Sequence, residues 1–233
     1  MTDVTGVTGG HVLAVLPLGA TEQHGPHLPR ETDTLLATAA AGLVGAGVLA
    51  GADHVRMLPA LAFGASGEHQ SFAGTVSIGT DALAETILEL GRSVCTWADR
   101  LLVVNGHGGN VEALRRAGSR LRYEERDCAW LSCRTSEHPT DTHAGHAETS
   151  LMLHLHPELV RTELALPGCT EPLADILPAM REGGVAAVST TGVLGDPTTA
   201  TEVEGRRLWE ALAADLRDRV GRWAPGEADG MLR

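Results

Sequence analysis

Short apolar runs alternate with longer amphipathic stretches along this chain, a pattern typical of an α/β fold. Val12–Leu18 and Leu101–Val104 are almost continuously apolar, as expected for strands buried on both faces of a parallel sheet. Val55–Pro59 and Ala129–Cys133 are shorter runs of the same kind, and Gly183–Thr191 resembles a further short strand. The pattern therefore predicts a mostly parallel central sheet.

Between these runs, apolar residues recur every three or four positions, the spacing of one helix face. This spacing predicts helices from Thr34 to about Leu49, Asp81 to about Ala98, Val111 to about Tyr123, Leu151 to Leu155 and Glu202 to about Trp223. In the last helix, the residues expected to face inward are Leu208, Leu212, Leu216 and Val220.

The remaining segments carry weaker signals. Trp97 is expected to be a core residue, and Leu164–Pro178 is expected to be irregular. The tail Pro225–Arg233 is expected to be mobile or to contact another subunit. Because no repeat, linker or low-complexity segment interrupts the sequence, residues 1–233 are expected to form one domain.

Composition argues against several classes of partner. The net charge of −12 disfavours binding to nucleic acid or to an anionic membrane. The four cysteines show no Cys-x-x-Cys spacing, so reduced thiols are expected. The N-terminus lacks the basic segment of a signal peptide, and the first apolar run is too short to span a bilayer. These features favour a cytoplasmic protein.

Polar side chains crowd the Gly/Pro-rich loop after the first strand. Glu22, His24 and Asp33 offer the oxygen and nitrogen donors that divalent metals prefer. In open α/β sheets, ligands bind at the carboxyl ends of the strands, where this loop lies. The alternatives are a solvated turn and, for Asp33, a role as the N-cap of the next helix. His27 and Glu31 in the same loop receive no ligand role.

Two more loops at strand ends carry similar groups. His107 lies in the glycine-rich segment 105–110, whose spacing matches neither common phosphate-binding loop. His143 and Glu148 lie in the polar segment 140–150. Alone, each histidine could be structural, and Glu148 could be only a carboxylate at the start of a helix, where the helix dipole favours negative charge. Together, the three loops predict a metal site at one edge of the sheet.

Asp33 could bridge two metals at this edge. One metal would bind Glu22, Asp33 and His107, and the other would bind the set His24, Asp33 and Glu148. Two such ions suit hydrolysis of an unactivated amide, because they polarise the carbonyl and supply hydroxide at neutral pH. Mixed imidazole and carboxylate donors suit Zn(II), Fe(II) or Mn(II).

Two further pairs of residues have predicted roles near the metals. His143, with Glu148, is the candidate catalytic group: it could carry a proton from water to the leaving nitrogen, or it could merely support the site. Glu68 and His69, in a Gly-rich loop, are candidates for contacting the substrate.

Three motifs resemble the creatininase family of metal-dependent amidohydrolases. They are Gly-Ala-Thr-Glu-Gln-His-Gly-Pro-His-Leu-Pro (residues 19–29, followed by Thr32-Asp33), Asn-Gly-His-Gly-Gly-Asn (105–110) and His-Ala-Gly-His-Ala-Glu-Thr-Ser (143–150). The resemblance implies a three-layer α/β/α fold, a divalent metal centre of one or two ions, and a homo-oligomer, expected to be a hexamer or larger. It also implies metal-ligand roles for Glu22, His24, Asp33 and His107.

The sequence departs from creatininase itself in two respects. Creatininase has a glutamate ligand two residues after the histidine, whereas this chain has Gly109. Glu148 is the predicted replacement. Creatininase also closes tryptophans over its small substrate, but residues 133–148 contain none. This absence argues against creatinine as the substrate.

Residues 65–80 and 181–201 resemble a peptidase branch of the family that acts in redox-cofactor biosynthesis. This resemblance implies hydrolysis of the Gly–Val bond of a modified precursor peptide, which releases a crosslinked C-terminal Val-Tyr unit. The alternatives are a small-molecule amidohydrolase acting on a cyclic amide or formamide, and a non-catalytic metal-binding scaffold.

Overall fold

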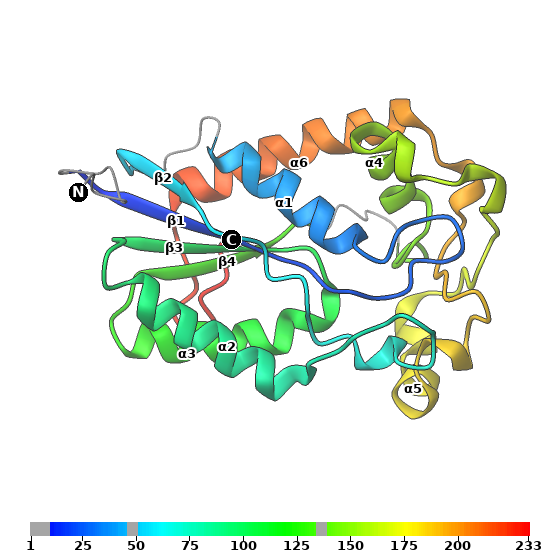
Figure 1. Cartoon of the computed structure of the whole chain (residues 1–233), viewed down its shortest axis with the longest axis horizontal. Helices are drawn as coiled ribbons and strands as arrows, with labels where there is room; N and C mark the ends of the chain where they lie inside the picture. The colour runs from blue at the N-terminus through cyan, green and yellow to red at the C-terminus, as the bar shows by residue number, and fades with distance from the viewer. Residues whose placement is uncertain (1–9, 46–50, 134–138) are drawn as a thin grey trace.

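A four-stranded parallel sheet forms the centre of the protein (Figure 1). The structure is a computed structural model that describes residues 10–45, 51–133 and 139–233. The strand order is β2-β1-β3-β4. The strands are β1 (Val12–Leu18), β2 (His54–Met57), β3 (Arg100–Asn105) and β4 (Cys128–Ser132), close to the four predicted from apolar runs.

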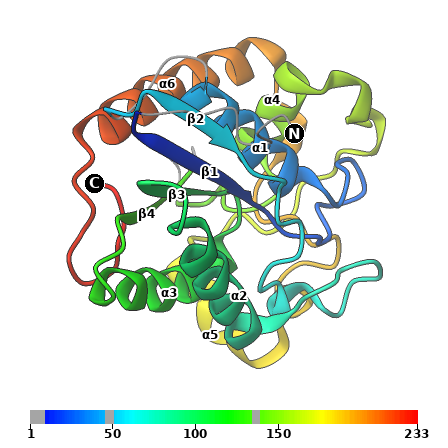
Figure 2. The same cartoon turned by 60° about the vertical axis from the view of Figure 1, so that its left-hand side comes forward.

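Helices cover both faces of this sheet. In Figures 1 and 2, α1 and α6 lie on one face, and α2 and α3 lie on the other. The α-helices are α1 (Thr32–Gly45), α2 (Gly79–Val94), α3 (Val111–Tyr123), α4 (His146–Leu155), α5 (Leu173–Gly183) and α6 (Glu202–Arg222). The predicted three-layer α/β/α fold is confirmed.

The side chains of β1 alternate between two apolar cores. Ala14 and Leu16 pack with residues of α2 and α3, whereas Leu13 and Val15 pack with residues of α1 and α6. Because successive side chains of a strand point to opposite faces, a strand covered on both faces must be apolar at every position. This is why Val12–Leu18 is continuously apolar.

The C-terminal tail is packed against the sheet rather than mobile, so that part of the prediction was wrong. The Trp130 N–H of β4 donates to Gly230 O at 3.0 Å, and the Leu232 N–H donates to Trp130 O at 2.8 Å. Leu232 is fully buried. The tail therefore covers the edge of β4, whose main-chain groups would otherwise be open to water.

Three other expectations were wrong. Trp97 is 46 % exposed, because α2 ends at Val94 and the tryptophan lies in the turn beyond it. The predicted strand 183–191 contains a 3₁₀ turn at Val185–Ala187 and no strand. The segment 164–178 is not wholly irregular, since α5 begins at Leu173. The predicted end of the first helix lies outside the described residues.

The loops after β1 and β3 and the segment that begins at residue 139 meet at the carboxyl edge of the sheet, on the right of Figure 1. The strands that precede these loops are buried, so their ends are held in fixed relative positions. None of the helices in the described ranges combines the length and apolar character needed to cross a bilayer.

We expect Leu216→Ala to lower the free energy of unfolding by about 2–5 kcal/mol, because it removes a fully buried side chain of α6. Val203→Ala, at a position 78 % exposed on the same helix, should change it by less than about 0.5 kcal/mol. Urea unfolding followed by circular dichroism measures both. Equal effects of the two changes would contradict this account of the core.

Candidate metal centre

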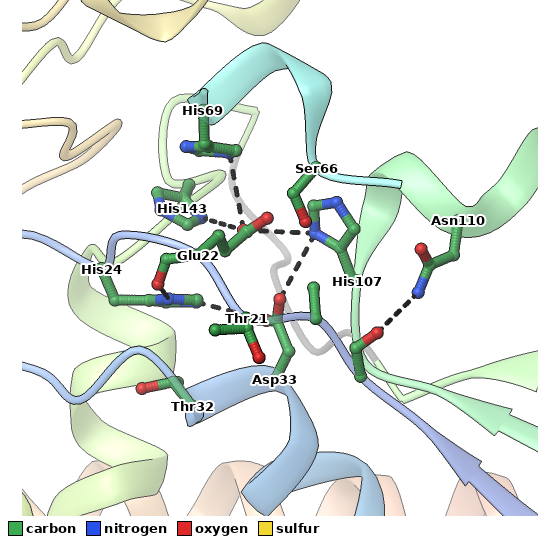
Figure 3. Close-up of polar contacts among 12 residues, drawn as sticks. Thr21, Glu22, His24, Thr32, Asp33, Ser66, His69, His107, Asn110 and His143 are labelled. Carbon is green, nitrogen blue, oxygen red and sulfur yellow. Dashed lines mark hydrogen bonds and ion pairs between the residues drawn. The ribbon is translucent and has the colours of Figure 1, made fainter. Parts of the chain in front are cut away.

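The loop after β1 folds back so that Glu22, His24 and Asp33 face one another (Figure 3). Its closure is held by the Glu22 N–H, which donates to Arg30 O at 3.2 Å. Asp33 is inside the first turn of α1, which begins at Thr32, so Asp33 is not the N-cap. Its carboxylate instead lies 3.2 Å from His24 Nε2.

His107 reaches the same carboxylates from the end of β3. Its Nδ1 lies 3.2 Å from Glu22 Oε1 and 3.3 Å from Asp33 Oδ2. The main chain of His107 is fixed by Asn105, whose Nδ2 donates to His107 O at 2.7 Å. Asn105 was not predicted to matter for the site.

Asn110 ties three segments of the site together and was also missed. Its Nδ2 donates to Gly19 O at 3.0 Å and to Asn105 Oδ1 at 3.1 Å, and its Oδ1 accepts from the Ala65 N–H at 2.9 Å. The only sequence signal for these roles is that the two asparagines bracket the histidine motif. The pairing itself depends on segments far apart in the chain.

The structure brings together the donors of both predicted metal sites. In the first set, one potential ligand atom from each of Glu22, Asp33 and His107 lies within 4.8 Å of the others. The second set, His24, Asp33 and Glu148, meets the same limit. Asp33 is common to both sets, as the bridging prediction requires. A third set of the same kind joins Glu22 and His24 with His143.

The burial of the carboxylates fits a cation. Glu22 has no exposed surface, and neither of its carboxylate oxygens has a hydrogen-bond partner within the described residues. Asp33 Oδ2 is also buried and has no hydrogen-bond partner within the described residues. A buried anion without hydrogen bonds is costly, and a bound cation removes that cost. The donor set therefore fits one or two divalent ions.

These buried groups shift one another's pKa values. Burial raises the pKa of Glu22. Burial acts to lower the pKa of His24, but Asp33, through its charge and its hydrogen bond, together with the charges of Glu148 and Glu22 raises that pKa to about 9. Burial acts to raise the pKa of Asp33, but His24 and His107 outweigh it and hold the pKa well below its usual range. A cation binding here must displace protons from the imidazoles.

The residues predicted to contact substrate lie at the centre as well. His69 is buried, with Nε2 3.5 Å from Glu22 Oε1, so it is closer to the candidate ligands than predicted. Glu68 Oε1 lies 3.4 Å from His107 Nε2. A Cβ atom on Gly109 would overlap His107 and come within 2.7 Å of that Glu68 oxygen. Glycine at this position therefore leaves room for Glu68.

His143 and Glu148 approach from the segment before and within α4. His143 Nδ1 lies 3.5 Å from Glu22 Oε1, and burial together with the charge of His24 lowers the pKa of His143 to about 4. A neutral imidazole is able to accept a proton. Glu148 Oε2 accepts the Ala144 N–H at 2.6 Å and lies 4.0 Å from His24 Nε2. Glu148 is therefore close enough to His24 and Asp33 for its predicted role as a metal ligand.

The other polar residues of the first loop lie apart from the cluster. The buried ring of His27 makes its contact with Thr149, 2.9 Å from Nε2 to Oγ1. Glu31 is exposed.

A pocket of about 310 Å³ opens onto the centre. Its polar end contains Asp33, Glu68, His107, His143 and Glu148. Its apolar lining is made by Leu173, Leu177 and Met180 of α5 together with Leu194. A substrate here would place a polar bond against the cluster and an apolar group against α5.

A parallel sheet with this cluster at its carboxyl edge defines a metallohydrolase-like site, and the sequence matches a family of that kind. Residues 1–220 match the family model described as "Creatininase: Creatinine amidohydrolase". The chain therefore belongs to the creatininase family and is a hydrolase that acts on amide bonds, as predicted.

Relatives within the family fall into two groups. The chain is 57 % identical over 223 residues to the "Mycofactocin precursor peptide peptidase" of Mycobacterium tuberculosis, covering 94 % of this chain and 88 % of the relative. The protein of that name from Mycobacterium ulcerans is 54 % identical over 222 residues, with the same coverage. The "Creatinine amidohydrolase" of Pseudomonas putida is 28 % identical over 244 residues, covering 92 % and 90 %.

Solved structures share the fold. One titled "Creatininase Mn" has a TM-score of 0.73 and 29 % identity, covering 94 % of this chain and 93 % of the other. A mutant creatininase of "Zn-Zn type" has a TM-score of 0.72 and 29 % identity, covering 93 % and 92 %.

We expect Asp33→Asn to remove all tightly bound divalent metal, because Asp33 is shared by both donor sets. Glu22→Gln should remove only one ion if two are bound. Asp175→Asn, the same change on the exposed side of α5, should leave the metal content unchanged. Elemental analysis of the purified proteins measures the content, and circular dichroism checks the fold. Wild-type metal content in Asp33→Asn would contradict the bridging role.

Proposed function

We propose that this protein is a metal-dependent peptidase that hydrolyses an amide bond of the mycofactocin precursor peptide. The observation that carries the proposal is the pair of buried carboxylates, Glu22 and Asp33, which lie within a cluster of donors for cations beside a pocket with apolar side chains in its lining. The names of the relatives that are more than 50 % identical support the peptide as substrate.

The proposed mechanism divides the work among the chain's own residues. A bound divalent cation supplies a polarised substrate carbonyl and a water that deprotonates near neutral pH. Glu22, His24, Asp33 and His107 hold the cations. His143, neutral and facing Glu22, accepts the proton of the attacking water and passes it to the leaving nitrogen. Glu148 lies at the pocket, where it completes the second donor set.

The apolar wall of the pocket supports a proposal for which peptide bond is hydrolysed. Leu173, Leu177 and Met180 are spaced by four and three residues, so they form one stripe on α5. This stripe lines the same pocket as the polar cluster. An apolar side chain next to the scissile amide would bury its surface there. We infer that the bond cut is the Gly–Val bond of the modified peptide, with the valine against α5, and that the product is the crosslinked Val-Tyr unit.

The same proposal extends to the cofactor and the assembly. Fe(II) and Zn(II) are the first choices for the metal, with Mn(II) as a further one, since imidazole and carboxylate donors suit all three. The titles of the Mn and Zn–Zn creatininase structures support this range. A homo-oligomer, a hexamer or larger, and a cytoplasmic location complete the proposal.

The first test incubates the purified, metal-loaded protein with the modified precursor peptide and follows the products by mass spectrometry. We expect release of the Val-Tyr fragment, and no turnover by chelator-treated protein, Glu22→Ala or His107→Ala. His54→Ala, on strand β2 and away from the site, is the matched control and should remain active. Full activity of Glu22→Ala, of His107→Ala or of metal-stripped protein would contradict the mechanism. Intact peptide with rapid turnover of a small cyclic amide would favour the small-molecule alternative.

The second test concerns the apolar wall. We expect Leu177→Ala to raise KM for the peptide about tenfold or more, because apolar contact with the substrate is lost. Leu159→Ala, at a partly exposed leucine that does not line this pocket, should leave KM unchanged. Steady-state kinetics on the peptide separate KM from kcat. An unchanged KM in Leu177→Ala would place the peptide elsewhere.

A further inference from the structure

Gln23 lies between two candidate metal ligands, Glu22 and His24, and has no role in the mechanism above. It is nearly fully buried. Its amide group contacts His69, and its main-chain oxygen contacts the neighbouring ring of His143. These contacts determine which ring nitrogen of each histidine carries the hydrogen.

The orientation of the amide follows from its main-chain partners. The Gly25 N–H donates to Oε1 at 2.9 Å, and Nε2 donates to Gly192 O at 3.0 Å. Reversing the amide would place its oxygen against a carbonyl oxygen, which cannot donate. Gly192 has a φ of +82°, and a Cβ atom there would overlap the amide group, so glycine is required for this packing.

One amide hydrogen then remains for His69. Gln23 Nε2 lies 2.8 Å from His69 Nδ1 and has no lone pair, so Nδ1 must accept. The hydrogen of the neutral His69 ring is therefore on Nε2. That nitrogen faces Glu22 Oε1 at 3.5 Å. His69 thus presents an N–H to a candidate metal ligand.

His143 has the opposite relation to the cluster. Its Nε2 lies 2.8 Å from the main-chain oxygen of Gln23, which can only accept. Nε2 therefore carries the hydrogen, and Nδ1 keeps its lone pair, directed toward Glu22 at 3.5 Å. The 3.0 Å approach of Gln23 Nε2 to His143 Nε2 is not a hydrogen bond, because both amide hydrogens are already donated.

We propose that Gln23 is a positioning residue that fixes the tautomers of His69 and His143. It directs the N–H of His69 toward Glu22 Oε1, 3.5 Å away, and leaves His143 with a bare Nδ1 at the centre. Groups that orient metal ligands through a second hydrogen bond typically affect metal affinity or activity 10–100-fold. The catalytic consequence rests on the proposed function, whereas the tautomers do not.

The tautomers are tested first, without any substrate. Long-range ¹H–¹⁵N NMR of ¹⁵N-histidine-labelled, metal-free protein at neutral pH reports the protonated nitrogen of each ring. His69→Gln and His143→Gln variants assign the signals. We expect the hydrogen on Nε2 in both residues of the wild-type protein. A hydrogen on Nδ1 of either residue would overturn the proposal, whatever the fate of the peptidase assay.

The second test uses Gln23→Glu, which keeps the shape but removes the amide hydrogens. We expect His69 to gain a hydrogen on Nδ1, because an ionised carboxylate can only accept. His143 should keep its tautomer, since its partner is a main-chain oxygen. In the zinc-loaded enzyme, kcat should fall about 10–100-fold, with a smaller change in KM. Gln70→Glu makes the same change at an exposed neighbour of His69 and should leave both readouts unchanged.

Two results of this second test would overturn the proposal. One is a wild-type kcat in Gln23→Glu. The other is an unchanged His69 tautomer in that variant. If Gln23→Glu does not fold, the wild-type NMR spectrum still decides the tautomers.

Discussion

The burial of two carboxylates is the constraint on which the site depends. Glu22 and Asp33 lie away from water, and three of their four oxygens lack hydrogen-bond partners within the described residues. Such a group is stable only beside positive charge. Imidazoles from the loop after β1 and from three other loops lie within 3.5 Å of these oxygens, and a divalent cation would add further positive charge. The loops must therefore converge to make the buried anions tolerable.

The sheet makes this convergence possible. The buried strands β1 and β3 end side by side, so the loops that carry Glu22 and His107 begin within a few ångströms of each other. Asn105 and Asn110 then lock these loops through main-chain groups. Rigid elements beneath a metal centre keep its donors in place, which is what a preorganised hydrolytic site needs. Gln23 adds to this by fixing which ring nitrogens of His69 and His143 carry a hydrogen.

One glycine and one apolar wall shape the pocket beside the candidate ligands. A Cβ atom at position 109 would come within 2.7 Å of Glu68 Oε1, so Gly109 leaves space for this carboxylate from another loop. Leu173, Leu177 and Met180 of α5 give the pocket an apolar face. A helix stripe suits an extended chain with an apolar side chain better than it suits a small polar ring. The metal chemistry can thus be kept while the substrate changes.

The sequence alone determined the four strands, most of the helices and the candidate ligands, because apolar runs and polar loops at strand ends are local patterns. It did not determine α5, the position of the tail or the exposure of Trp97. Those depend on which surfaces remain uncovered once the sheet and helices are packed. The roles of Asn110 and Gln23 were equally invisible, since their partners are up to 169 positions away in the chain. The sequence of the loop after β1 showed which donors are present, and only the tertiary structure decided which of their atoms meet.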